Sequence, residues 1–301
     1  MRTFIAAIVF VGIFGTAICT IAQMSSTNFE IRWDTVGAGG DETSSSSSYI
    51  LRDTTGNVGI GDSTSSSYGL RAGYRQGVND QFIEFSFLAQ NQTVYQPATA
   101  ILGNIITTTT SDFTVGDLIA VIQDRGQGQI SAIGTVISVG ATTIEADELI
   151  DGGSSPAIDG SNDYVYLLDL PSVNLGTLTA SAVRTSIIGI EVSTDSDGGY
   201  VVQVASDGDL RSGAYTINAV ADGVVSAGSE EFGGRSSDTT LAGSTFDSAD
   251  TAFTTSFQNI MDSSSEAHAV RSFLTLMGSI DGSTVNETYT QELTFVISGT
   301  Y

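Results

Sequence analysis

Three short segments near the N-terminus share one pattern of apolar and polar positions. Each has an aromatic residue, a variable residue, an aliphatic residue and an arginine, and each follows a serine-rich lead. They are Phe29 to Arg32, Tyr49 to Arg52 and Tyr68 to Arg71. A period of two gives a strand one apolar face, and a unit this small cannot bury that face alone. We therefore expect successive copies to pair with one another and to pack on another layer.

The middle of the chain predicts a compact set of strands. Residues 82–87 alternate as a strand, and Leu118 to Ile122 form a short buried one. Residues 133–139 and 142–144 predict a hairpin across Gly140 and Ala141. The turn at 115–117 resembles that of small SH3-like barrels, and Tyr164 to Leu168 would close the structure. We interpret residues 94–169 as a small β-barrel inserted between two strands of another domain.

From Leu170 onward, apolar segments recur at regular spacing and are separated by Asp- and Gly-rich turns. The expected strands are residues 184–193, 199–206, 214–220, 267–278 and 289–298. Several short strands with such turns and almost no proline are typical of an antiparallel sandwich. The polar interval 233–250 is expected to be a loop, and 253–261 fits either a short helix or a strand.

Together these patterns predict an all-β protein: an antiparallel β-sandwich with N-terminal strand repeats and a small inserted β-barrel. The expected domains are the serine-rich repeats at 23–78, the sandwich at 79–93 and 170–301, and the barrel at 94–169. Residues 1–22 are set apart as a signal peptide, because Arg2 precedes an uncharged apolar run from Phe4 to Ala22. Cleavage is expected before Gln23. An uncleaved membrane anchor is the alternative, and both interpretations export the rest of the chain.

Charge and composition exclude several function classes. The net charge is −24, lysine is absent, and all ten basic residues are arginine. Such a chain repels nucleic acid and anionic membranes, and it cannot form a lysine Schiff base. The single cysteine, Cys19, lies in the apolar leader, so the mature chain has no disulfide and no cysteine metal site.

Three aspartate clusters are candidates for calcium ligands. Asp195 and Asp197 resemble the start of an EF-hand loop, although Ser206 occupies the twelfth place. Asp207 with Asp209, and Asp159 with Asp163, form the second and third clusters. The alternative is that these residues simply suit hairpin turns. Calcium is the only cofactor that we consider.

No catalytic constellation is visible. A Ser-His-Asp hydrolase would have to use His268, the only histidine, and no Gly-x-Ser-x-Gly motif is present. We interpret His268 as a surface residue and expect the protein not to be an enzyme.

Four segments carry a resemblance to secreted Ser/Thr-rich β-sandwich surface proteins of candidate-phylum bacteria. They are the repeats ending at Arg71 to Tyr74, residues 194–200, residues 228–233 and the ending at 289–295. The last strand pair is also similar to WxL-type cell-wall domains, although the chain has no Trp-x-Leu. The resemblance implies export and residence on the cell surface.

The expected function is therefore structural, as a subunit of a surface layer or filament that associates through β-strand edges. Leu293, Phe295 and Ile297 alternate toward one face of the last strand. The serine-rich repeats offer a second set of strands, whose spacers carry few of the lysine or proline residues that normally block edge pairing. The partners would be other copies or cell-envelope components. The alternative is an adhesin or a calcium-stabilised glycan-binding module.

Overall fold

The computed structural model describes residues 82–300 and, before them, the backbone of six short strand segments between Met24 and Ala72. The chain divides into two compact units, Met1–Asp80 and Gln81–Tyr301. All regular elements among the described residues are β-strands, which confirms the all-β prediction. None of these residues belongs to a helix that is long and apolar enough to cross a membrane. The expected leader at 1–22 lies outside the described residues.

The N-terminal segments form three separate two-stranded pairs. In each pair the first strand lies antiparallel to the strand of the motif that follows it. The pairs are β1 (Met24–Ser25) with β2 (Glu30–Ile31), β3 (Ser44–Ser45) with β4 (Ile50–Leu51), and β5 (Gly61–Thr64) with β6 (Gly69–Ala72). The expectation that successive copies pair is wrong for these strands. A four-residue connection is cheaper in entropy to close than a span of about 20 residues.

Two antiparallel sheets of the second unit form the predicted sandwich. One has the order β7–β14–β20–β18 at the end of a larger sheet, and the other is β19–β15–β21. Their bounds are β7 Ile83–Leu102, β14 Arg184–Thr194, β15 Tyr200–Ser206, β18 Glu231–Ser236, β19 Gln258–Ser263, β20 Ala267–Ser279 and β21 Leu293–Gly299. A hairpin, β16 (Leu210–Ser212) with β17 (Tyr215–Ile217), lies between β15 and β18 in sequence.

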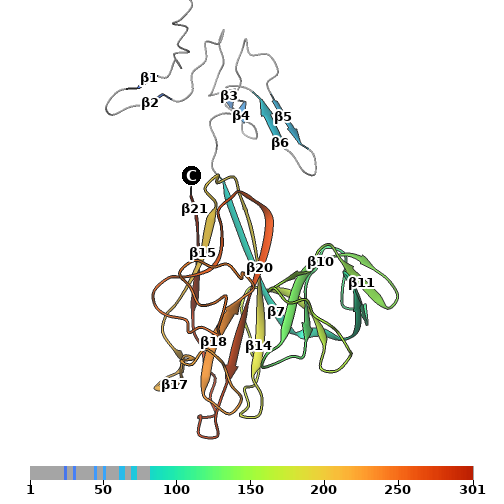
Figure 1. The fold of residues 1–301 in the computed structure, drawn as a ribbon, viewed down its shortest axis with the longest axis vertical. Helices are drawn as coiled ribbons and strands as arrows, with labels where there is room; N and C mark the ends of the chain where they lie inside the picture. The colour runs from blue at the N-terminus through green and yellow to red at the C-terminus, as the bar shows by residue number, and fades with distance from the viewer. Residues whose placement is uncertain are drawn as a thin grey trace, which may run out of the picture. The chain divides into compact units, whose positions relative to one another are not determined.

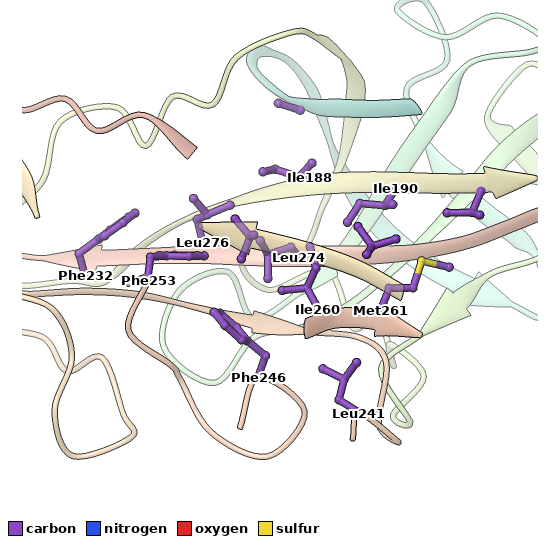
Figure 2. Close-up of a cluster of buried hydrophobic side chains, with 14 of the residues drawn as sticks. Ile188, Ile190, Phe232, Leu241, Phe246, Phe253, Ile260, Met261, Leu274 and Leu276 are labelled. Carbon is purple, nitrogen blue, oxygen red and sulfur yellow. The ribbon is translucent and has the colours of Figure 1, made fainter. Parts of the chain in front are cut away.

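The core of the sandwich consists of side chains that alternate inward from both sheets. Ile188 and Ile190 of β14 and Leu274 and Leu276 of β20 meet Ile260 and Met261 of β19 (Figure 2). Phe246 and Phe253 come from the connection before β19 and fill one end of this cluster. Side chains at every second position of a strand share a face, so the sequence pattern leads directly to this core.

The remaining strands form what we call the small lobe, drawn mainly in green in Figure 1. Their bounds are β8 Ile105–Thr108, β9 Leu118–Gln123, β10 Ile130–Val139, β11 Thr143–Ala146, β12 Ile150–Asp151 and β13 Tyr164–Leu170. Hydrogen-bonded pairs run in a cycle, β7–β13–β9–β10–β11–β8–β7, around a separate apolar cluster that includes Ile119, Val136 and Val165. The hairpin across Gly140 is confirmed. The inserted barrel itself stays a prediction with which these pairings agree.

Strand β7 belongs to both the sandwich and the small lobe, so the expected boundary at 93–94 falls inside a single strand. Residues 83–89 pair with β14, and residues 89–97 pair with β13. Where β7 turns away from β14, two glutamine side chains take the place of its backbone as hydrogen-bond partners of β14. Gln90 Oε1 accepts from the Ile187 N–H at 3.0 Å, and Gln92 Nε2 donates to the Thr185 carbonyl at 3.1 Å. These bonds satisfy backbone groups that would otherwise be buried without a partner. The polar run 90–92 therefore marks a crossing point within a strand.

Strands β14 and β20 are buried on both faces. Ile188 and Ile190 point into the sandwich, whereas Ile187 of β14 and Phe273 of β20 pack against Ile122, Tyr166 and other side chains of the small lobe. Residues 272–279 of β20 are consequently all buried, without the alternation of a half-exposed strand. The small lobe thus covers the outer face of the first sheet.

Arg271 joins the small lobe to the sandwich. From β20 its guanidinium donates to Thr135 Oγ1 at 2.9 Å and to both carboxylate oxygens of Asp147, and it lies 3.6 Å from Glu191 Oε2. The side chain is 13% exposed. Charge-assisted hydrogen bonds of this kind are stronger than neutral ones, and they require a fixed geometry.

The interval 233–250, expected to be a loop, begins with strand β18. Gly233 and Gly234 lie in that strand because neighbouring segments leave no room for side chains: a Cβ on Gly233 would be 2.6 Å from Val220 Cγ1, and one on Gly234 would be 2.5 Å from Phe253 Cζ. Glycine in a strand often marks such a close approach. The undecided segment 253–261 contains the start of a strand, β19 from Gln258.

The turn between β14 and β15 requires glycine at position 199. Gly199 has φ +86°, and a Cβ there would lie 1.8 Å from the Ser263 carbonyl oxygen. We expect Gly199→Ala to cost more than about 4 kcal/mol, because a backbone clash is added to an unfavourable φ. Gly213→Ala is the matched control, since Gly213 also has positive φ (+58°) but nothing within 4 Å, and should cost about 1–2 kcal/mol. Urea unfolding of both variants tests this, and equal losses would contradict it.

The Arg271–Asp147 contact predicts a pH dependence. Burial raises the pKa of Asp147, but hydrogen bonds from Arg271 and the backbone N–H groups of Glu148 and Thr135 outweigh it, so the pKa lies below its ordinary value. A lowered folded-state pKa contributes stability that is present above the unfolded value, about 3.9, and is lost as the pH falls through the folded-state pKa.

Asp147→Asn should therefore cost roughly 1–3 kcal/mol at pH 7, toward the low end because the carboxylate is partly screened by water. The difference from the unchanged protein should shrink below about pH 4. Denaturant unfolding between pH 2.5 and 7 measures it, with Glu287→Gln, an exposed carboxylate, as control. A difference that stays constant across this range would contradict the assignment.

Candidate functional site

The first aspartate pair locks a turn. Asp195 Oδ1 accepts from the Phe82 N–H at 3.0 Å, which holds the start of β7 against the β14–β15 turn. Asp197 is exposed in the same turn. Gly198 and Ser196 of this turn donate to the Thr300 carbonyl and so fix the end of β21. These bonds hold the β14–β15 hairpin together with the start of β7 and the end of β21.

The second pair lies in the turn between β15 and β16, next to the start of β21. The Asp207 carboxylate accepts from the Glu292 N–H at 2.9 Å and forms an ion pair with Arg211. Hydrogen bonding from Arg211, followed by the Glu292 N–H, lowers the pKa of Asp207. Asp209 contributes its backbone carbonyl, which accepts from Arg211 at 3.3 Å. Arg211 therefore already neutralises the Asp207 carboxylate, which a calcium ion would need as a ligand.

The third pair contains the only fully buried aspartate among the described residues, Asp163, which is 2% exposed. Its Oδ1 accepts from the Asp124 N–H at 3.0 Å, and its Oδ2 accepts from the N–H groups of Asp159 at 2.8 Å and Gly160 at 2.9 Å. Among the described residues, the Asp159 carboxylate accepts only from the Ser161 N–H, at 2.8 Å. A carboxylate with three backbone donors is well satisfied without a metal.

Within the described residues, no three His, Cys, Asp or Glu side chains converge closely enough to hold a metal ion. Each of the three pairs has a structural partner instead. Calcium binding stays a prediction, and turn locking is the role that these contacts support.

His268 lies on the surface at a bulge near the start of β20. Its side chain is 74% exposed, and its Nε2 lies 4.0 Å from Glu266 Oε2. The adjacent Ala269 has φ +53°, and its N–H donates to Ser193 Oγ. This position suits a surface residue, as the sequence suggested.

One side of the sandwich is closed by its connections. At β18, Gly234 pairs with Thr251, and the Ser236 N–H donates to the Phe246 carbonyl at 2.8 Å. At β19, the Asp262 N–H donates to Asp238 Oδ2 at 2.9 Å, and Asn259 Nδ2 donates to the Ala242 carbonyl. These contacts occupy backbone groups that another strand would need.

The opposite side is open, and we call it the open side: residues 83–88 of β7 with β21. In the described residues this part of β7 pairs only with β14, and β21 pairs only with β15. The Phe87 and Phe295 rings stack with centroids 5.3 Å apart, so the two edges lie next to each other. Ile83, Phe87, Leu88 and Val296 remain 37–38% exposed. Two unpaired edges and exposed apolar side chains thus coincide.

Part of the open side is visible in the sequence. The alternation of Leu293, Phe295 and Ile297 is confirmed, since these side chains pack against the sandwich core. The contribution of Phe87 was missed, because only the stacking of two edges brings it next to Phe295. No sequence signal shows that β18 and β19 are covered whereas β7 and β21 are not.

Comparison with protein-family models, curated proteins and solved structures finds no match to this chain.

The turn-locking role of Asp163 predicts a loss that calcium does not change. An asparagine side chain has one accepting oxygen and one donating NH₂ group. In Asp163→Asn, at least one backbone N–H would therefore face the NH₂ group without an acceptor, and the folded state should lose about 1–3 kcal/mol of stability. Asp159→Asn is the control, because asparagine keeps the one bond that Asp159 accepts. Thermal unfolding with EDTA and with millimolar calcium measures both. If calcium raises the melting temperature and Asp163→Asn removes that increase, the site is a calcium site instead.

Proposed function

We propose that this protein is an exported, non-enzymatic structural protein of the cell surface, whose copies associate by adding a strand at the open side. The observation that carries the proposal is the contrast between the two sides of the sandwich. Connections cover β18 and β19, whereas β21 and residues 83–88 of β7 keep one unpaired edge each in the described part of the chain.

Strand addition fits the chemistry of these edges. An extended segment gains main-chain hydrogen bonds at an open edge, and its alternate side chains set the register. Residues 293–299 contain no charged residue and no proline, and Glu84 is the only charged residue in 83–88. Charges and prolines are the usual protection of an edge. An added strand would also cover Phe87 and Ile83.

The charge distribution favours the N-terminal segment of a second copy as the added strand. Residues 81–301 contain 27 of the 34 acidic residues and five arginines, a net charge of −22, whereas residues 23–80 contain seven acids and four arginines, a net charge of −3. Two sandwich units therefore repel each other far more than a sandwich unit and an N-terminal segment do. The remaining repulsion is screened by salt.

The test uses mature protein, residues 23–301, in a salt and calcium series followed by light scattering and negative-stain microscopy. Ordered assemblies should grow with ionic strength. Val296→Asp should raise the salt concentration needed for assembly or abolish assembly, because it places a charge beside the β21 edge. The control is Val139→Asp, a substitution at equal exposure (37%) in the small lobe. A monomer under all conditions, or equal effects of both substitutions, would overturn the proposal.

A further inference from the structure

A groove of about 450 Å³ lies between the small lobe and the outer face of β18 and β20. Phe273, Thr275 and Met277 of β20 and Arg235 of β18 form its floor. The small lobe contributes residues 127–131 with Gly152 and Ser154, and the opposite wall comes from Gly223, Val224, Asp247 and Asp250. Its volume lies within the range of about 300–1,000 Å³ that is typical of small-molecule sites. It is separate from the open side.

The groove contains both donors and acceptors that the protein leaves unused. The Arg235 guanidinium makes one hydrogen bond, from Nη2 to the Ser248 carbonyl at 3.1 Å, and has no carboxylate of the described residues within 4.0 Å. Asp247 Oδ1 is buried and has no hydrogen-bond partner among the described residues. A buried acceptor without a partner carries a desolvation cost. A small shift of the Asp247 side chain toward a ligand hydroxyl in the groove would remove that cost.

The mixture of Arg235 with Asp247 and Asp250 disfavours the binding of small cations and small anions. A cation would be attracted by Asp247 and Asp250 but repelled by Arg235, and an anion would be repelled by both carboxylates and by the −22 charge of the unit. Most other polar groups of the lining are neutral, among them Gln127, Gln129 and Thr275. A neutral molecule with many hydroxyls can donate to the carboxylates, accept from Arg235 and lie with its C–H face on Ile130 and Met277.

We propose that this groove binds a neutral oligosaccharide, held by Arg235, Asp247 and Asp250 over the apolar floor. The site is independent of strand addition at the open side, so either activity can fail without the other. Arg235 and Asp247 would contribute most of the affinity, because hydrogen bonds to charged groups are the strongest that such a ligand can form.

The test is titration calorimetry of residues 23–301 against maltotriose, cellotriose, mannotriose and chitotriose, with glycine and calcium chloride as charged probes. At least one trisaccharide should bind. Arg235→Met and Asp247→Asn should each weaken that binding at least about tenfold. Arg184→Met is the control, because Arg184 also makes one bond to a backbone carbonyl, that of Thr177 at 3.1 Å, and also has no carboxylate partner in the described residues. Asp197→Asn, an exposed carboxylate, is the control for Asp247.

Methyl NMR of labelled methionine locates the binding independently of the variants. Met277 lies in the groove, whereas Met261 is buried in the sandwich core, so the saccharide should shift the signal of Met277 and leave that of Met261 unchanged. The proposal is overturned if no trisaccharide binds, if binding survives both groove substitutions, or if only glycine or calcium shifts the Met277 signal.

Discussion

The burial of β14 and β20 on both faces is the constraint on which the rest of the structure depends. Their inward side chains, such as Ile188 and Leu274, hold the two sheets together, and their outward side chains, such as Ile187 and Phe273, hold the small lobe. Burying one large apolar side chain contributes about 1.5–3 kcal/mol to stability, so exposing either face of these strands would strongly destabilise the fold. The position of the small lobe, and with it the groove, follows from this pair of strands.

Strand β7 passes from the sandwich into the small lobe and therefore changes its pairing partner from β14 to β13. At the change, backbone groups of β14 lose their partner in β7. Gln90 and Gln92 replace that partner by supplying side-chain hydrogen bonds to Ile187 and Thr185. Arg271 then links the small lobe to β20 through Asp147 and Thr135. Polar side chains thus complete a junction whose main stability is apolar. Arg235, on the neighbouring strand β18, has no carboxylate within 4.0 Å in the described part of the chain.

The acidic character of the chain has two separate consequences. Several carboxylates hold turns by accepting backbone N–H groups. Those of Asp195 and Asp207 fix the starts of β7 and β21 at the side of the sandwich, and that of Asp163 fixes a turn of the small lobe. The exposed carboxylates instead create a strong negative field, which opposes contact between sandwich units except where salt screens it. Short-range hydrogen bonds and long-range repulsion therefore come from the same residue type.

The sequence by itself determined the fold class, most strands and the turns, because alternation with period two and Asp-Gly turns are local properties. It also identified the apolar face of β21. Only the tertiary structure decided that β18 is a strand, since Gly233 and Gly234 resemble a loop until Val220 and Phe253 are packed over them. It alone showed which backbone N–H groups Asp163, Asp195 and Asp207 accept, that β7 continues through residues 90–92, and that Phe87 meets Phe295. These features depend on contacts between residues far apart in the chain, which a local pattern does not contain.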